Sequence, residues 1–203
     1  MFGGFKSNRE LVNHLINRGV LKTERIIKAF LEVDRADFIR KGFLDSAYGD
    51  FPLPIGEGQT ISQPYTVAFM LELLQPREND LILDVGCGSC WTTALLASIA
   101  DNSRVIGVEI IKELAEFCNG NLEKYNFDNV EIYNADKLPP NSGTFNRILV
   151  SAAAKELPKE LVNAMMEDAI MVMPINSSIF KVEKKGGKLL MEEYYGFAFV
   201  ELK

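Results

Sequence analysis

Apolar residues recur at helical spacing in the first part of the chain, between residues 11 and 16 and again between residues 26 and 31. Ser7 or Asn8 can cap the first of these helices, and Thr23 can cap the second. The pattern therefore predicts two amphipathic helices, which cover part of a sheet or a cleft. Neither helix carries a residue pattern that points to chemistry.

From Asp80 onward the pattern changes to short apolar runs that alternate with amphipathic stretches. The predicted strands are residues 81–85, 104–108, 130–133, 147–151 and 170–174, and the predicted helices are residues 91–100 and 112–125. This alternation predicts a doubly wound, mostly parallel α/β sheet whose connecting turns meet at one edge. Two further apolar runs, 180–183 and 189–192, flank a Lys-Lys-Gly-Gly-Lys turn and predict a C-terminal antiparallel hairpin.

Residues 45–64 contain three prolines and three glycines, which no regular element tolerates. We therefore expect a loop over the whole of this segment. Loops of such length inside a compact domain are uncommon and are usually functional. The alternative is a structural wrap around the edge of the sheet.

The composition is that of an ordinary globular protein, since the 203 residues are 47% hydrophobic and 25% charged. The length suits a single domain, residues 1–203, with N-terminal helices and a loop in 1–79 and an α/β core in 80–203. The net charge of −6 argues against broad binding to nucleic acid or to anionic membranes. No targeting segment is visible, and no stretch approaches the ~18 apolar residues of a membrane span.

The three cysteines are an odd number and predict no disulfide framework, which is typical of a reducing cytoplasm. Cys87 and Cys90 form a Cys-x-x-Cys pair where a helix begins, a position that lowers a thiol pKa and suits a thiol–disulfide centre. A zinc site would need two more ligands, and neither Cys118 nor His14 stands at a recognisable spacing, so we expect no metal. The plainer interpretation is two small apolar residues packed under a turn.

The run Asp84-Val-Gly-Cys-Gly88 lies where a predicted strand passes into a helix, and glycines there permit a tight turn and close approach of a ligand. Glu109 ends the next strand, 25 positions after Asp84, where an acid can accept both hydroxyls of a ribose. Asp136 follows the strand after that and is expected at the same edge, near an adenine. These residues predict a nucleoside site; the alternative is a plain glycine turn with a helix cap.

This predicted site suits S-adenosylmethionine better than a dinucleotide. A pyrophosphate needs a free helix N-terminus and usually a third glycine, but Cys90 stands at that position and the bulky Trp91 follows. S-adenosylmethionine has no phosphate and carries a positive sulfonium, which an acidic site accommodates.

The run Leu53-Pro-Ile-Gly-Glu-Gly-Gln-Thr-Ile-Ser-Gln-Pro64 is very close to the signature loop of protein-L-isoaspartate O-methyltransferases. Flanking segments agree as well, from Val33-Asp-Arg35 to the closing Phe199-Val-Glu-Leu202, so the chain resembles this family over nearly its whole length. The resemblance implies a Rossmann-like, S-adenosylmethionine-dependent methyltransferase fold. It also implies methyl transfer to the carboxylate of L-isoaspartyl residues in damaged proteins, which initiates their repair.

The resemblance also implies a role for individual residues. Ser62 resembles the catalytic serine, which lies between the cofactor's methyl group and the substrate. The implied cofactor-binding residues are Gln59, Thr60, Ser62, Asp84, Gly86, Gly88, Glu109 and Asp136. Ile61 and Val200 are the implied substrate-binding residues.

Such a reaction needs few catalytic side chains. A carboxylate is already ionised at pH 7 and can attack a sulfonium methyl group without a general base. Catalysis then comes from holding the reacting atoms in line and excluding water, with Ser62 orienting the carboxylate by a hydrogen bond.

We expect a cytoplasmic monomer whose partners are isoaspartyl-containing proteins and peptides.

Several residues depart from the family's pattern, and those at positions 90, 137 and 201 bear on the predicted site. Cys90 stands for the third glycine of the turn, Lys137 for a glycine near the adenine, and Glu201 for a proline in the closing segment. A side chain at position 90 is expected to narrow the methionine pocket. The departures leave a non-catalytic or retuned member as one alternative, and the Cys-x-x-Cys pair leaves a thiol redox protein as another.

Overall fold

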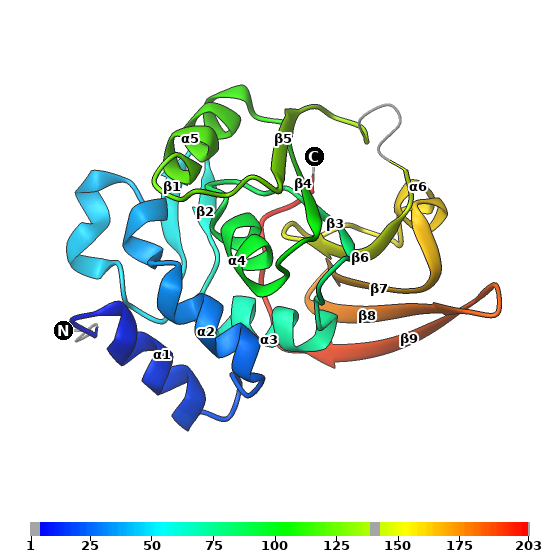
Figure 1. Cartoon of the computed structure of the whole chain (residues 1–203), viewed down its shortest axis with the longest axis horizontal. Helices are drawn as coiled ribbons and strands as arrows, with labels where there is room; N and C mark the ends of the chain where they lie inside the picture. Colours follow the sequence, from blue (N-terminus) through cyan, green and yellow to red (C-terminus); the bar gives the residue numbers. More distant parts are fainter. Residues whose placement is uncertain (1–4, 139–142, 203) are drawn as a thin grey trace.

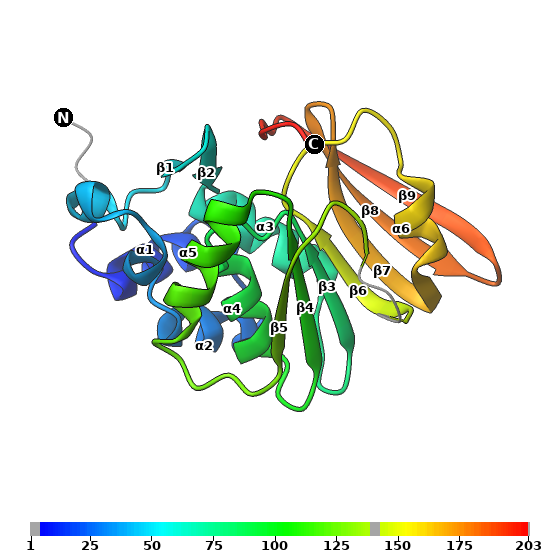
Figure 2. The ribbon, with the colours of Figure 1, turned by 90° about the horizontal axis from the view of Figure 1, so that it is seen from above.

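The computed structural model describes residues 5–138 and 143–202, which form a seven-stranded sheet with helices on both faces (Figures 1 and 2). Its strands are β3 (Leu81–Val85), β4 (Arg104–Glu109), β5 (Val130–Asn134), β6 (Phe145–Val150), β7 (Met165–Ile175), β8 (Ser178–Lys185) and β9 (Lys188–Tyr195). They lie in the order β5-β4-β3-β6-β7-β8-β9, parallel from β5 to β7 and antiparallel in the last two pairs. The predicted mostly parallel sheet with a C-terminal antiparallel hairpin is confirmed.

The helices are α1 (Asn8–Asn17), α2 (Glu24–Glu32), α3 (Pro64–Leu74), α4 (Trp91–Ile99), α5 (Lys112–Leu122) and the short α6 (Lys159–Asn163), with 3-10 turns η1 (Arg35–Phe38) and η2 (Lys41–Ser46). Three of them, α3, α4 and α5, pack on the sheet, while α1 and α2 lie outside them. Figure 2 shows these five helices on one side of the sheet and α6 on the other. No helix in the described residues is long and apolar enough to cross a membrane.

Alternate residues of the central strands enter two hydrophobic cores, one on each face of the sheet. Ile82 of β3 and Val105 of β4 are buried on the face that carries α4. Their neighbours Leu83 and Ile106 are buried in the core of the opposite face. Because both faces are covered, these strands read as continuous apolar runs, which is why the sequence pattern located them.

The segment of residues 45–64 is more regular than expected. Within it, β1 (Leu53–Gly56) and β2 (Gln59–Ile61) pair as an antiparallel hairpin, called the signature hairpin below, and Pro64 begins α3. The prediction of a loop throughout is therefore wrong. Proline is tolerated in an exposed edge strand, as at Pro54, and in the first turn of a helix, where its missing N–H has no partner to lose.

Candidate active site

A pocket opens where β3, β4 and β6 end, between the signature hairpin and the C-terminal segment. Of the residues that the sequence singled out, its lining contains Gln59, Thr60, Ile61, Ser62, Gly86, Gly88, Glu109, Asp136 and Val200. Five segments that are far apart in the chain thus meet around one cavity. Asp84 differs, because it is fully buried below the turn and is not part of the described lining.

The turn between β3 and α4 forms one wall of the pocket. Gly86 and Gly88 have φ angles of +72° and +55°, in the left-handed region that glycine adopts without strain. The Gly86 N–H donates to the Val108 carbonyl at 2.8 Å and ties the turn to the end of β4. A Cβ atom on Gly88 would lie 3.2 Å from Cδ1 of Ile55, so a side chain there would press on the signature hairpin. Glycine therefore keeps this wall open to a ligand.

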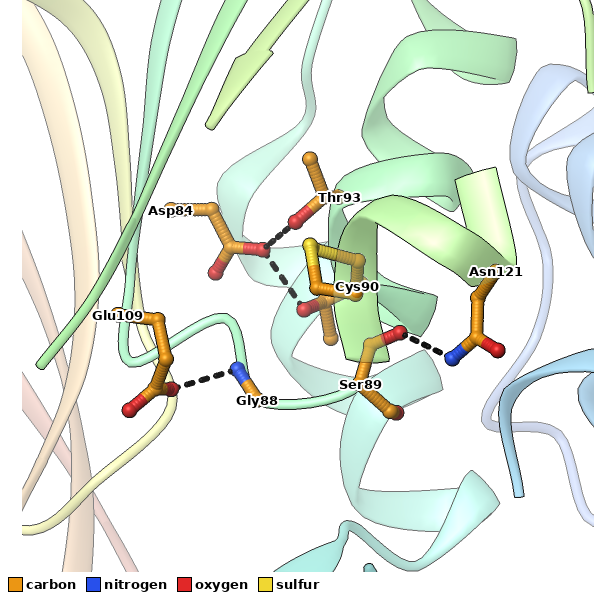
Figure 3. Close-up of a disulfide and its surroundings, with 9 residues drawn as sticks. Asp84, Gly88, Ser89, Cys90, Thr93, Glu109 and Asn121 are labelled. Atoms are coloured by element: carbon orange, nitrogen blue, oxygen red, sulfur yellow. Dashed lines mark hydrogen bonds between the residues drawn. A yellow bond between two sulfur atoms is a disulfide. The ribbon is translucent and has the colours of Figure 1, made fainter. Parts of the chain in front are cut away.

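Glu109 faces the turn from the end of β4 and is 5% exposed. Its Oε2 accepts the Gly88 N–H at 2.9 Å (Figure 3), and its Oε1 accepts the Ile111 N–H at 2.9 Å. A carboxylate has about four lone-pair positions, so two remain for a ligand after these bonds are made. The two backbone donors hold the group in a fixed orientation at the pocket wall.

Asp84 has a supporting position under the turn. Its Oδ2 accepts the hydroxyls of Thr92 and Thr93, both at 2.7 Å, and so holds the first turn of α4 against β3 (Figure 3). Its Oδ1 is buried and has no hydrogen-bond partner among the residues that the structure describes. Burial raises the pKa of Asp84 to about 6, although the two hydroxyls oppose the shift.

Arg35 holds the chain on either side of the signature hairpin in place. Its guanidinium is fully buried and donates to the carbonyls of Ala47 at 2.7 Å, Gly49 at 3.0 Å, Phe51 at 2.9 Å and Ser62 at 3.3 Å. The group also lies over the Trp91 ring, 5.4 Å from its centre. Burial lowers the pKa of Arg35 to about 9, so the side chain stays charged at neutral pH. Sequence reasoning gave this residue no role, because no local pattern shows that one side chain reaches four distant carbonyls.

The C-terminal segment closes the other side of the pocket. The Val200 carbonyl accepts the Ala153 N–H at 2.8 Å, and the Leu202 N–H donates back to the Ala153 carbonyl at 2.9 Å. These bonds bring Val200, Glu201 and Leu202 into the lining.

The pocket is acidic. The charged side chains in its described lining are Glu109, Asp136, Glu160 and Glu201, together with Lys137. This surplus of carboxylates favours a ligand with a positive charge or with hydroxyl donors. Histidine is missing from the lining as far as it is described, since His14 lies on α1 with its Nε2 3.5 Å from Oδ2 of Asp50.

The cysteines do not pair as the sequence suggested. Cys90 forms a disulfide with Cys118 of α5 (Figure 3). Cys87 is a free, buried thiol. The three sulfur atoms lie within 4.8 Å of one another. The sequence predicted no disulfide framework and did not anticipate this single bond, and the suggested Cys87–Cys90 pair is wrong. Cys118 is remote in sequence, and only the packing of α5 against the turn brings it to Cys90.

Comparison with known proteins agrees with this arrangement. The profile of the family described as protein-L-isoaspartate(D-aspartate) O-methyltransferase matches residues 6–203. A protein-L-isoaspartate O-methyltransferase of Methanopyrus kandleri is 38% identical over 98% of this chain and 92% of its own length. That of Pyrobaculum islandicum is 37% identical over 95% and 97%. A crystal structure of a candidate protein-L-isoaspartate O-methyltransferase from Plasmodium falciparum, in complex with S-adenosyl-L-homocysteine, has a TM-score of 0.87 at 28% identity, covering 98% of this chain and 99% of that one.

The sheet order and the pocket at its edge define an S-adenosylmethionine-dependent methyltransferase fold. Within that class, the chain belongs to the protein-L-isoaspartate(D-aspartate) O-methyltransferase family.

The raised pKa of Asp84 predicts a pH-dependent stability. Between the unfolded value of 3.8 and the folded value of about 6, the folded protein retains a proton that the unfolded chain has released. The contribution of Asp84 to the free energy of unfolding is therefore fully present below pH 4. It falls by about 3 kcal/mol as the pH rises to 7. Asparagine does not titrate, so the free energy of unfolding of Asp84→Asn should rise relative to that of the parent between pH 4 and pH 7. Urea unfolding across this pH range measures the difference. A constant difference between the two proteins would contradict the assignment.

Replacement of Arg35 tests the role of its buried guanidinium. Arg35→Met leaves four carbonyls without this donor and should lower the free energy of unfolding by about 3 kcal/mol. Arg104→Met is a matched control, since its partner Glu131 is exposed and such pairs contribute about 1 kcal/mol or less. Urea denaturation measures the free energy of unfolding of both variants. Equal losses of stability would mean that Arg35 does not hold the chain around the signature hairpin in place.

Proposed function

We propose that this protein transfers a methyl group from S-adenosylmethionine to the carboxylate of L-isoaspartyl residues in damaged proteins, which initiates their repair. One observation carries the proposal: the signature hairpin and Ser62 line the same pocket as the glycine turn and Glu109. The family to which the chain belongs supports the same activity.

The residues present fit S-adenosylmethionine. The glycine turn leaves a ligand access to the backbone, and Glu109 is held with lone pairs free for a ribose diol. Asp136 lines the pocket beyond the end of β5, on the side proposed for the adenine. The acidic lining suits the positive sulfonium, which supplies the activated methyl group when it is bound. Gln59 and Thr60, at the start of β2, complete the proposed cofactor set.

The acceptor is proposed to enter between the signature hairpin and the C-terminal segment. Ile61 and Val200 line the pocket from these two sides, and Ile61 ends the extended strand β2. A carboxylate acceptor is ionised at neutral pH, so a site without histidine is sufficient. Ser62 is proposed to orient that carboxylate by donating its hydroxyl proton in a hydrogen bond. Positioning of this kind can supply about 7–11 kcal/mol.

The departures from the family's pattern leave room for a ligand. Cys90 is absent from the described lining, because its side chain turns toward α5 and is bonded to Cys118. It therefore does not narrow the methionine pocket as the sequence suggested. Lys137 and Glu201 do line the pocket, and we propose that they adjust affinity and peptide preference. The non-catalytic alternative thereby loses one of its three supports, the one at Cys90.

We further propose that the enzyme is a single-domain monomer of the cytoplasm that acts on isoaspartyl proteins and peptides and not on nucleic acid or membranes. The net charge of −6 supports the exclusion of polyanionic partners. The two hydrophobic cores share the central strands, which supports one folding unit.

The first experiment is calorimetric binding of S-adenosylmethionine, followed in the same sample by methyl transfer to an isoaspartyl peptide. The matched peptide with ordinary aspartate is the control. Binding with transfer to the isoaspartyl peptide alone supports the proposal. Binding without transfer would mean a different acceptor, and no binding would return the non-catalytic alternative.

Replacement of Ser62 should affect turnover more than cofactor affinity. Ser62→Ala loses the proposed hydrogen bond to the acceptor, so kcat should fall about 10- to 100-fold, while the Kd of S-adenosyl-L-homocysteine changes little. Ser98→Ala is the control, because that hydroxyl donates to Glu32 at 3.0 Å and lies outside the pocket. Unchanged kcat in Ser62→Ala would remove this residue from the mechanism.

Replacement of Glu109 should weaken cofactor binding. Loss of a charged acceptor costs about 1.5–3 kcal/mol, so the Kd of S-adenosyl-L-homocysteine in Glu109→Ala should rise about 10- to 150-fold by calorimetry. Glu116→Ala serves as control, since that acid is exposed on α5 and pairs only loosely with Lys112 at 3.7 Å. Equal Kd values for both variants would refute the ribose assignment.

A further inference from the structure

Two interactions join the turn between β3 and α4, which forms one pocket wall, to helix α5 (Figure 3). The Asn121 side-chain amide donates to the Ser89 carbonyl at 3.0 Å, and the disulfide joins Cys90 to Cys118. Asn121 and Cys118 are three positions apart, so both lie on the buried face of the same helix. One of these two interactions is covalent and can be broken by reduction alone.

The backbone conformation of Cys90 is unfavourable for a residue with a side chain, so the disulfide matters more here than at an ordinary position. It is the residue before the first turn of α4 and has a φ angle of +66°, in the left-handed region where a side chain is disfavoured. Its neighbours Ser89 and Trp91 both line the pocket, whereas Cys90 itself points to α5. A change of backbone conformation at Cys90 would therefore move two residues of the pocket wall. The disulfide holds this conformation in place.

We propose that the Cys90–Cys118 disulfide is a redox-responsive site that sets the affinity of the pocket for its nucleoside cofactor. The inference rests on the proposed function. A small dithiol is the reductant: its two thiols give two electrons and two protons to the disulfide. Cys90 and Cys118 are fully buried, so the dithiol reaches them when the turn opens locally from α5. The S–S bond of the protein breaks into the Cys90 and Cys118 thiols, and the dithiol closes to a cyclic disulfide. The reverse exchange with a cyclic disulfide restores the bond.

Cys87 stays outside this exchange. Its thiol is buried near the other two sulfur atoms, and burial raises its pKa well above the usual range, with Asp84 and Glu109 adding to the shift. The thiolate is the nucleophile in disulfide exchange, so a thiol that remains protonated attacks slowly. The disulfide therefore keeps its Cys90–Cys118 pairing. In the cytoplasmic setting proposed above, a disulfide is typically transient or redox-sensing, not structural.

Linkage gives the inference a second, independent consequence. If the disulfide strengthens cofactor binding by some factor, bound cofactor must stabilise the disulfide against reduction by the same factor. S-adenosyl-L-homocysteine should therefore shift the reduction midpoint of Cys90–Cys118 in a dithiol titration. That readout follows thiols and needs no methyl transfer.

The experiment is calorimetric titration of S-adenosyl-L-homocysteine into the oxidised and the dithiothreitol-reduced protein. Alkylation after denaturation, read by mass, should count one thiol in the oxidised protein and three in the reduced one. We expect the reduced protein to bind about tenfold more weakly, the factor that corresponds to the usual cost of a side chain in the left-handed region.

Three variants separate this inference from general damage to the fold. Cys118→Ser cannot form the disulfide and should bind as weakly as the reduced parent, whether or not reductant is present. Cys90→Gly removes both the disulfide and the side chain that disfavours the turn, so it should bind as tightly as the oxidised parent in both conditions. Cys87→Ser retains the disulfide and should keep the response to reductant.

Equal affinity of the oxidised and reduced parent would overturn the redox inference and leave the proposed function intact. Weak binding by Cys90→Gly would also overturn it, because the conformation of Cys90 would then not be the cause. Three thiols in protein treated with a cyclic disulfide would show that the bond does not form. Absence of binding in every redox state would overturn the proposed function as well, which distinguishes that failure from the others.

Discussion

The parallel pairing of β3 with β4 is the constraint on which the rest of the site depends. It brings the carboxyl ends of both strands to one edge, so that Gly88 of the turn reaches Glu109 at 2.9 Å although 21 positions separate them. That hydrogen bond fixes the turn and the carboxylate together. The signature hairpin and the C-terminal segment then have a fixed wall to close against, and the pocket follows from the register of two strands.

The two walls of the pocket are supported by three different kinds of interaction. Asp84 holds α4 from below through two threonine hydroxyls, and α5 holds the turn from behind through Asn121 and the disulfide. Arg35 fixes the opposite wall by donating to carbonyls on both sides of the signature hairpin. Two of these supports bury an ionisable group, which costs stability unless hydrogen bonds compensate. Both buried groups lie beside the candidate active site, where the positions of the pocket walls must be fixed.

This economy explains why the site contains so few reactive side chains. Methyl transfer to an ionised carboxylate needs alignment and exclusion of water, and neither requires a titrating group at neutral pH. Rigid backbone and buried hydrogen bonds can supply both. The reactivity of the pocket then depends on the interactions that hold its walls. Two of these supports respond to the surroundings: Asp84 responds to pH and, as we propose, the Cys90–Cys118 disulfide responds to redox conditions.

The sequence by itself determined the sheet, the glycine turn and the acids at its edge, because buried strands and tight turns leave local patterns in residue type. The resemblance to a known family pointed to the part of segment 53–64 that lines the pocket. Only the tertiary structure decided that Cys90 pairs with Cys118, that Asp84 lies below the pocket and that Arg35 holds four carbonyls. The hairpin at Pro54 and the helix at Pro64 were also missed. The hairpin and the helix are local, and they were missed because prolines and glycines were expected to exclude regular structure. The other three features depend on packing between segments that are far apart in the chain, and local residue patterns carry no record of such distances.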